Sequence, residues 1–364
     1  MGSRHTRREA MALGVGVAGA IAGCLGSRSG GTATGGSTPE GPRDSSAAPP
    51  AADRSPLVTY GAGRLRDETV SGGVPKDGIP SVDDPSLADA DEATFLRDDD
   101  LVFGVVRGDD VRAYPRKILV HHEIVNDRLD GVAVSVTYCP LTGTTLGFER
   151  GSTTFGVSGN LVNSNLVMYD RATDSRWPQV LSTAVEGPLA GRPLREFDLV
   201  WTRWSRWRTR HPETTVLSER TGYARNYGVD PYGSYAPRRG YYARDSTMFD
   251  PLATDDRLGP KAVVVGVRTA TDAVAVTVER LRERGVVTVT GTGDRFAFVH
   301  DAALDATYTY RVPPDVTVES TTDDAVRVDG TRHAPDAVPL ERLHGIESMW
   351  FAWAGFYPET TLYA

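Results

Sequence analysis

The chain has 364 residues, of which 40% are hydrophobic, and its formal net charge at pH 7 is −8. This length and hydrophobic content allow a sizeable core in two domains or one large one, which excludes a chain that is disordered throughout. Arginine greatly outnumbers lysine and aspartate exceeds glutamate, so the surface is expected to be acidic and well hydrated. This balance argues against nucleic acid as a partner.

The N-terminus is predicted to be an export signal. Arg7 and Arg8 precede an apolar run at residues 10–23, which is too short to span a bilayer as a helix. An arginine pair before such a run resembles a twin-arginine signal, and the Ile-Ala-Gly-Cys sequence that ends at Cys24 resembles a lipobox. We therefore expect a signal over residues 1–24 and a lipid on Cys24 that anchors the protein on the outer face of the cytoplasmic membrane. The alternative is an uncleaved signal anchor.

A tether and an irregular lead-in are predicted to follow the signal. Residues 25–56 are rich in Gly, Ser, Thr, Pro and Ala and have almost no apolar bulk, a composition typical of a disordered coil. Residues 57–94 are expected to form an irregular lead-in to the folded body. If Cys24 is lipidated, Cys139 is the only remaining thiol, so the sequence predicts no intrachain disulfide.

The rest of the chain is predicted to contain two related halves, residues 95–217 and 262–364, with a connecting segment at 218–261. A shift of 146 positions places a Trp-x-x-Trp motif and the following Pro-Glu-Thr-Thr, starting at Trp204, on the same motifs starting at Trp350. Each tryptophan pair fits one face of a short helix that ends before the proline, and is expected to anchor the core. The sequence predicts an α+β, β-rich fold of two halves from an internal duplication, with short tryptophan-bearing helices.

Two further patterns recur in the same order. The strands expected at 101–106 and 111–114 match residues 262–276 at a shift of 162 positions. Aspartates spaced four apart also recur, at Asp170, Asp174, Asp301 and Asp305. Because both halves carry these carboxylates, we interpret them as turn or cap residues and not as a catalytic pair.

The candidate site lies in features that only the first half has. The segment His-His-Glu-Ile-Val-Asn-Asp at 121–127 looks like a helix end, on which His122 and Asn126 would share one face. A Cys-Pro pair closes the predicted strand that ends at Cys139, a position where sites are often built. The candidates for hydrogen bonding to a ligand are Asn126, Asn160, Asn163 and Asn165, together with Arg225 and Tyr227 from a Gly-rich loop of the connecting segment.

A thiol enzyme is one hypothesis for this site. Cys139 would be the nucleophile and His122 or His121 its base. Asp127 or Asn126 would orient the imidazole. A neighbouring imidazolium would lower the pKa of the thiol, so we expect Cys139 to lie within reach of one of the two histidines.

Binding of a metal or a small ligand is a second hypothesis. The soft sulfur of Cys139 favours copper or zinc. The candidate metal ligands are His121, His122, Glu123 and Cys139, with Met168 as an alternative. A third hypothesis is a surface interaction module without a site. The sequence contains no Gly-rich phosphate loop and no Gly-x-Ser-x-Gly elbow.

Several motifs resemble one known family. The sequences HEIVND, TYCPLTGTTLGFER, GVSGNLVNSNLVMYDRATDSRWPQ, DPYGSY and WFAWAGFYPET resemble the family called domain of unknown function 3179, over residues 95–364. The resemblance implies no established activity, cofactor or substrate. Members of this family often carry a second cysteine where Thr142 stands, so the resemblance does not imply a two-thiol redox centre here.

Overall fold

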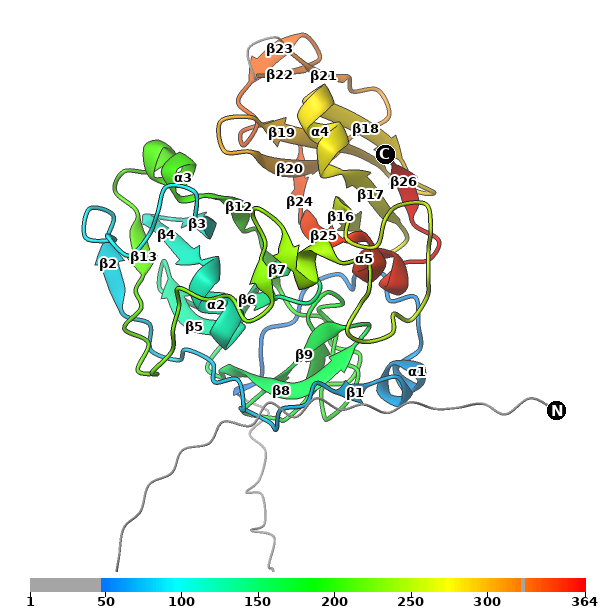
Figure 1. Ribbon diagram of the computed structural model, residues 1–364. Helices are drawn as coiled ribbons and strands as arrows, with labels where there is room; N and C mark the ends of the chain where they lie inside the picture. Colours follow the sequence, from blue (N-terminus) through cyan, green and yellow to red (C-terminus); the bar gives the residue numbers. More distant parts are fainter. Residues whose placement is uncertain (1–46, 322–324) are drawn as a thin grey trace, which may run out of the picture. The chain divides into compact units, whose positions relative to one another are not determined.

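The computed structural model describes residues 47–321 and 325–364 (Figure 1). Within these residues the fold is rich in β-strands, which form several sheets, and it has few helices, all of them short. No helix in this part of the chain has the length and apolar character needed to cross a membrane. The helices are α1 Ala62–Asp67, α2 Arg116–His122, α3 Trp204–Arg210, α4 Val278–Arg284 and α5 Trp350–Phe356, with a 3-10 helix, η2, at Tyr241–Ala243.

The first half contains three sheets, with strand orders β12-β3-β4-β13-β2, β11-β7-β6-β5 and β1-β8-β9-β10. The strands predicted at 101–106 and 111–114 are confirmed as β3 and β4. The strands are β1 Val70–Ser71, β2 Leu87–Asp89, β3 Leu101–Arg107, β4 Asp110–Pro115, β5 Ile124–Leu129, β6 Val132–Cys139, β7 Thr144–Glu149, β8 Phe155–Val162, β9 Asn165–Asp170, β10 Arg176–Pro178, β11 Glu196–Phe197, β12 Val200–Arg203 and β13 Thr215–Leu217.

The second half contains the sheets β25-β16-β17-β26, β18-β19-β20-β24 and β21-β22-β23, and the connecting segment adds the pair β14-β15. The strands are β14 Gly233–Ser234, β15 Arg239–Gly240, β16 Val263–Arg268, β17 Ala273–Thr277, β18 Val286–Thr290, β19 Arg295–Asp301, β20 Ala306–Arg311, β21 Val318–Ser320, β22 Val326–Val328, β23 Thr331–His333, β24 Glu341–Leu343, β25 Ile346–Met349 and β26 Thr361–Tyr363.

The folded body begins before residue 57. Ala51 forms an isolated β-bridge with Leu194, so residues 47–56, predicted as the end of the tether, belong to the fold. Residues 57–94 form α1, β1 and β2 between irregular stretches. The predicted signal with Cys24, and the tether before residue 47, lie outside the described residues.

The tryptophan pairs anchor the core, as predicted. Trp204 and Trp207 lie on α3, Trp350 and Trp353 lie on α5, and none of the four is more than 1% exposed. Both helices end before the proline, because the residue before a proline is disfavoured in helical geometry. Each pair therefore fixes a short helix on the sheet formed by the strands on either side of it.

The inner tryptophan of each pair covers a glycine in the neighbouring strand. A Cβ atom at Gly104 would lie 2.2 Å from the Trp207 ring, and one at Gly266 would lie 2.4 Å from the Trp353 ring. The indole N–H of each ring also donates to the threonine seven residues later, at 2.9 Å in both halves. The close approach of the ring therefore requires glycine on both strands.

The strand pairing of the first half recurs in the second half at a constant shift of 162 positions. The shift covers residues 101–149 and 263–311 without a gap, so it includes the β3–β4 hairpin, helix α2 and the three antiparallel strands β5, β6 and β7. The pairs that it relates include Val102–Pro115 with Val264–Thr277, Ile124–Thr137 with Val286–Val299, and Cys139–Thr144 with Asp301–Ala306.

This register corrects one of the sequence correspondences. The turn at Asp301 and Asp305 joins β19 to β20, so its counterpart is the turn after Cys139 between β6 and β7. Asp170 and Asp174 lie in a different turn, between β9 and β10. The first aspartate of each pair accepts a backbone N–H and the second has a positive φ, so both pairs are turn residues as interpreted.

A second correction concerns the helix expected to run into residues 121–127. Helix α2 ends at His122, Glu123 takes a left-handed conformation with φ 59°, and β5 begins at the next residue. His122 and Asn126 therefore do not share a helix face. The counterpart of Glu123 in the second half is Gly285, with φ 70°, which adopts this conformation without the steric cost of a Cβ atom.

The two halves contact each other reciprocally. Strand β25 of the second half contacts β7 of the first half, and β12 of the first half contacts β20 of the second half. Met349 N donates to Thr142 O at 2.9 Å, and the Thr202 hydroxyl donates to Leu304 O. Because β12 and β25 are equivalent strands, these contacts bring the same part of each half to the interface.

Candidate ligand-binding site

Cys139, the predicted nucleophile, is buried at the end of β6 and is 1% exposed. Its Sγ lies 3.7 Å from Ser164 O. Burial raises the pKa of the thiol to about 11, and the nearby Glu123 carboxyl contributes to the rise. An activated thiolate shows the opposite shift, because a neighbouring cation lowers the pKa of its thiol. This environment corrects the expectation of an activated cysteine.

The two histidines are turned toward other partners. His122 Nδ1 lies 2.8 Å from Pro80 O, and its Nε2 lies 2.7 Å from the Tyr227 hydroxyl. His121 Nε2 lies 2.9 Å from Val229 O. The chain reverses at the end of α2, so both rings face the lead-in and the connecting segment, and the expected thiol–imidazole contact is not formed.

The predicted metal ligands are likewise not assembled. Glu123 lies near Cys139, but both histidines are committed to the contacts described above. Met168 is buried in β9. Within residues 47–321 and 325–364, no group of three or more His, Cys, Asp and Glu side chains is arranged to hold a metal ion.

Asp127 is part of a buried ion pair. Its Oδ2 accepts from Arg112 Nη1 at 2.7 Å and from the Tyr114 hydroxyl at 2.7 Å. The carboxylate therefore joins β5 to β4 instead of orienting an imidazole, which is the role that the sequence had predicted for it.

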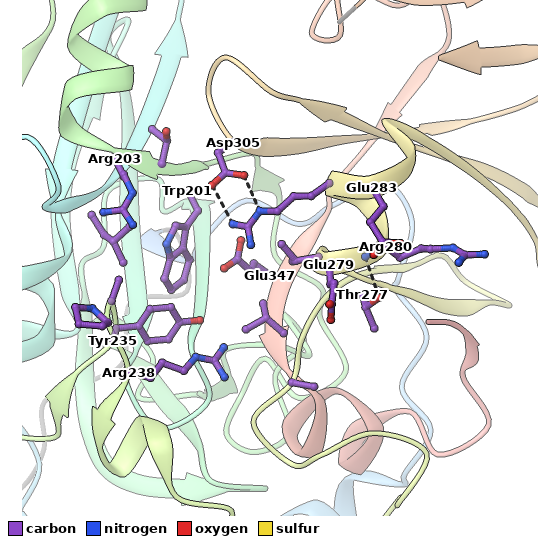
Figure 2. A pocket seen from close by; sticks show the side chains of 18 of the residues that line it. Trp201, Arg203, Tyr235, Arg238, Thr277, Glu279, Arg280, Glu283, Asp305 and Glu347 are labelled. Atoms are coloured by element: carbon purple, nitrogen blue, oxygen red, sulfur yellow. Dashed lines mark hydrogen bonds and ion pairs between the residues drawn. The ribbon is translucent and has the colours of Figure 1, made fainter. Parts of the chain in front are cut away.

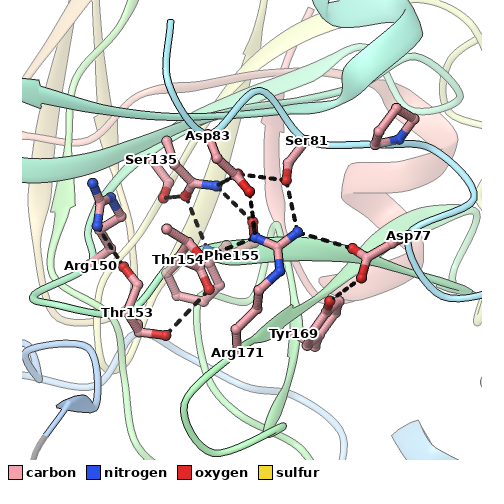
Figure 3. Close-up of polar contacts among 12 residues, drawn as sticks. Asp77, Ser81, Asp83, Ser135, Arg150, Thr153, Thr154, Phe155, Tyr169 and Arg171 are labelled. Carbon is pink, nitrogen blue, oxygen red and sulfur yellow. Dashed lines mark hydrogen bonds and ion pairs between the residues drawn. The ribbon is translucent and has the colours of Figure 1, made fainter. Parts of the chain in front are cut away.

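A polar network around Asp83 and Arg171 holds the lead-in on the first half (Figure 3), and Asn126 belongs to it. Its Nδ2 donates to Asp83 Oδ1 at 2.6 Å and to Phe155 O at 2.8 Å. Arg171 reaches the same lead-in through ion pairs with Asp77 and Asp83, at 3.2 and 3.1 Å. The figure shows Arg171 at the centre of these contacts. The Asn126 amide is therefore bonded within the protein.

The other predicted asparagines also bond within the protein. Asn163 Nδ2 donates to Ala352 O at 2.7 Å, which ties the first half to α5. Asn165 Nδ2 donates to Gln179 Oε1 at 3.0 Å. It also donates to the hydroxyls of Thr142, in the turn after Cys139, and of Thr144, at the start of β7. For Asn160 the pairing is through the backbone, with Ser71 across β8 and β1.

Arg225 and Tyr227 differ in their surroundings. Arg225 is exposed. Burial is the main cause that lowers the pKa of His121 and of His122, and the charge of Arg225 lowers both further. Tyr227 is buried, and its hydroxyl contacts His122 and Thr221. Tyr227 also lines a cavity of about 420 Å³ beside α2, next to Arg116.

A larger cavity, of about 680 Å³, lies between the two halves. Strand β12 contributes Trp201, the connecting segment contributes Tyr235 and Arg238, and β25 contributes Glu347, while α4 lines the opposite side. Figure 2 shows Trp201, Tyr235 and Arg238 along one wall, α4 with Glu279 along the other, and Glu347 between them. Aromatic rings with a few convergent polar groups are typical of small-ligand sites.

The Glu347 carboxyl has no hydrogen-bond or ion-pair partner among the described residues, although its backbone lies in the β16–β25 ladder. Burial raises the pKa of this carboxyl to about 7; Asp305 adds to the rise, while Arg282 and Arg238 oppose it. The residue as a whole is half-buried in the cavity wall. Its oxygens are therefore free to bind a group that enters the cavity.

Tyr235 connects this cavity to the Cys-Pro-Leu-Thr-Gly turn. Its hydroxyl is buried and has no hydrogen-bond partner in the described part of the chain. A Cβ atom at Gly143, the last residue of the turn, would lie 3.3 Å from this hydroxyl. The Tyr235 ring lies 5.2 Å from the Trp201 ring. The turn named by the sequence analysis therefore lies behind the cavity wall, although Cys139 does not line the cavity.

No sequence motif predicted Trp201 or Glu347 as a site residue. One signal was present, because the shift of 146 positions that relates the tryptophan pairs also places Trp201 on Glu347. The second half thus has a carboxylate on a strand where the first half has an aromatic ring. Strand β12 contacts the second half and β25 contacts the first half. Only these contacts bring both side chains to one cavity.

Comparison with known proteins identifies a family. The sequence matches the protein family of unknown function DUF3179 over residues 76–360. The chain belongs to this family. Neither the curated proteins nor the solved structures gave a match. The DUF3179 match includes every residue of the cavity wall described above, from Trp201 to Glu347.

Proposed function

We propose that this DUF3179 protein is an exported, membrane-anchored protein that binds a small polar organic ligand between its two halves. The observation that carries the proposal is the cavity of about 680 Å³, whose wall holds the Glu347 carboxyl, without a partner among the described residues, beside the rings of Trp201 and Tyr235. A carboxyl without a partner beside aromatic rings in one cavity favours a polar ligand that pairs with it.

Binding is tested by native mass spectrometry of the protein with a small-molecule fraction of its source cells. We expect one ligand per chain, and we expect Val278→Trp, which narrows the cavity from α4, to abolish the adduct. Val70→Trp is the matched control, because Val70 is exposed on β1 and lies away from the cavity. Thermal unfolding establishes that both variants fold. An adduct that persists in the Val278→Trp variant would mean that the ligand binds elsewhere. No adduct with the wild-type protein would favour a surface module without a site.

The anchor is supported by the arginine pair and the lipobox at the N-terminus. Cleavage before Cys24 would leave its thiol for lipid attachment. We expect Cys24→Ser to release the protein from the membrane fraction, and intact-mass measurement of the wild-type protein to show a lipid on Cys24. An unmodified Cys24 in membrane-bound protein would contradict the anchor.

We also propose that the two halves arose by internal duplication. The support is the gapless shift of 162 positions in strand pairing and the repeated fit of a tryptophan over a glycine. Sequences of the DUF3179 family should align residues 101–149 with residues 263–311 best at this shift. A better alignment at unrelated shifts would argue for convergence.

A further inference from the structure

A further cavity, of about 600 Å³, opens where residues 52–56 meet the two halves. It shares no lining residue with the cavity of about 680 Å³. Strand β11 of the first half lines it, as do the end of β16 and strand β24 of the second half. Its lining holds five arginines and His344 but three carboxylates, although the chain as a whole has a formal net charge of −8 at pH 7.

Asp198 and His344 join the two halves beside this cavity. His344 Nδ1 lies 2.9 Å from Asp198 Oδ1. The shift of 146 positions that relates the tryptophan pairs places Asp198 on His344, so equivalent positions of the two halves meet here. The other ring nitrogen, Nε2, has no hydrogen-bond partner among the described residues. His344 lines the cavity and Asp198 does not, so the Nε2 edge of the ring is the one that faces the cavity.

Arg342 is held by the same carboxylate. Its Nε lies 2.7 Å from Asp198 Oδ2, and its guanidinium lies 4.5 Å from the centroid of the Tyr308 ring. Its two terminal nitrogens have no hydrogen-bond partner in the described part of the chain. One carboxylate neutralises only one of two cations, so surplus positive charge remains at the cavity when His344 is protonated.

The other arginines of the lining have carboxylate partners, with the exception of Arg54. The pairs are Arg268 with Glu196, Arg311 with Glu341 and Arg195 with Glu149. Arg54 is exposed and has no partner among the described residues, and the same holds for its neighbour Asp53. The donors that are fixed in place and still free are therefore those of His344 and Arg342.

We propose that this cavity binds an oxyanion, a carboxylate or phosphate group of a ligand, through His344 Nε2 and the Arg342 guanidinium. A guanidinium presents parallel N–H groups that match the oxygens of such an anion. Asp198 holds both donors in position before the ligand arrives, which lowers the entropic cost of binding. The site is independent of the proposed function, because that function concerns the other cavity.

Binding at this place depends on the protonation of His344. The ring faces Asp198 from the loop before β12, Glu196 from β11 and Arg268 from β16, and it shares Asp198 with Arg342 from β24. Burial alone would lower the pKa of His344, but Asp198 and Glu196 outweigh burial and the charge of Arg268, so the pKa lies above its usual value.

The two forms of the ring act differently on an anion. The protonated ring donates from Nε2, whereas the neutral ring keeps its proton on Nδ1 beside Asp198 and presents a lone pair at Nε2. Affinity for an oxyanion should therefore fall as the pH rises through the pKa of His344.

The test measures binding of sulfate and acetate to the purified full-length protein by isothermal titration calorimetry at pH 6 and pH 8, with ionic strength held constant by sodium chloride. Both probes keep their charge between these pH values, so a pH dependence reports on the protein. Acetamide is the neutral counterpart of acetate. We expect at least one anion to bind with a Kd below about 10 mM, at least about threefold more tightly at pH 6, and acetamide to bind at least about tenfold more weakly.

Two variants locate the site. His344→Gln should weaken anion binding at least about fivefold at pH 6 and remove the pH dependence. Arg342→Gln changes an exposed side chain and should weaken binding at both pH values. The matched controls are His333→Gln on β23 and Arg239→Gln on β15, which do not line the cavity and should not change the affinity. Thermal unfolding checks that each variant folds.

The outcomes decide the inference and separate it from the proposed function. Tighter binding of sulfate would identify a phosphate-type group, and tighter binding of acetate a carboxylate. Equal binding of acetamide, no binding of either anion at about 10 mM, or an unchanged affinity in a folded His344→Gln or Arg342→Gln variant would overturn the anion site. Val278→Trp narrows the other cavity and should leave anion binding unchanged, and a loss of anion binding in that folded variant would contradict this placement.

Discussion

At the scale of single residues, Glu123 occupies a costly position. Its backbone is left-handed, a conformation in which a Cβ atom costs about 1–2 kcal/mol, and the other half uses Gly285 there. Its buried carboxyl has no hydrogen-bond or ion-pair partner among the described residues, and burial raises its pKa to about 8. Glu123 is therefore a source of instability at neutral pH, and it adds to the effect of burial in raising the pKa of the Cys139 thiol.

The first prediction is that Glu123→Gln changes how stability depends on pH. The folded pKa lies above the unfolded value, so the native state holds a proton that the unfolded chain loses between about pH 4.5 and pH 8. Wild-type stability should lose up to about 1.4 kcal/mol per pH unit across this window from this group alone. Chemical denaturation at pH 5, 6.5 and 8 should show Glu123→Gln gaining stability relative to wild type as pH rises.

Glu319→Gln serves as the control for this measurement, because its carboxylate is exposed on β21. If the free energies of unfolding of Glu123→Gln and wild type differ by a constant amount from pH 5 to pH 8, Glu123 titrates normally in the folded protein.

At the scale of secondary-structure elements, α3 and α5 are held by the same contact. Each helix places a tryptophan ring on a strand glycine, and the ring N–H bonds a threonine before the parallel return strand β13 or β26. The helices have only seven residues, so intrinsic helix stability contributes little. Tertiary packing of the tryptophans is what maintains them.

The second prediction is that Gly104→Ala and Gly266→Ala each destabilise the protein. The new methyl group would meet a tryptophan ring at less than van der Waals distance, and overpacking of this kind costs about 1–3 kcal/mol, occasionally more. Urea denaturation followed by tryptophan fluorescence measures the loss. Gly259→Ala, where no atom lies within 4 Å of the new Cβ, should stay within about 0.5 kcal/mol of wild type. A similar small effect at all three glycines would show that the rings can move aside.

At the scale of the whole molecule, one buried ion pair joins the two halves. Arg268 on β16 donates to Glu196 on β11, with Nη2 and Oε1 2.5 Å apart, and the arginine side chain is 1% exposed. Burial alone would raise the pKa of Glu196, but the Arg268 guanidinium, His344 and the Ser182 hydroxyl together outweigh burial, and the pKa lies below its usual value. The pair therefore stabilises the fold above the unfolded pKa, and that contribution is lost as the pH falls through the lower folded pKa.

The third prediction is that Arg268→Met destabilises the protein by about 3–5 kcal/mol at pH 7, because it leaves the Glu196 carboxylate buried without its partner. Adding Glu196→Gln should restore part of that loss, so the double variant should be more stable than Arg268→Met. The control is Arg208→Met, which breaks an exposed pair with Asp98 and should cost less than about 1 kcal/mol. Additive losses in the double variant would mean that the two side chains do not stabilise each other.

The sequence alone was sufficient for features that depend on local periodicity and repeated spacing. Alternating apolar residues indicated β3 and β4, and the Trp-x-x-Trp motifs before proline indicated α3 and α5 as core anchors. The family motifs identified DUF3179. These predictions succeeded because side chains on one face of a strand or helix recur at a fixed spacing along the sequence.

The site residues depended on tertiary structure. His122, Asn126 and Cys139 are close in sequence, but one left-handed residue at Glu123 ends the helix and sends their side chains to different partners. Trp201 and Glu347 are 146 positions apart, and only the reciprocal packing of β12 and β25 on opposite halves brings them to one cavity. Backbone reversals and contacts between halves are set by the packing of the complete chain, which no local pattern of residues records.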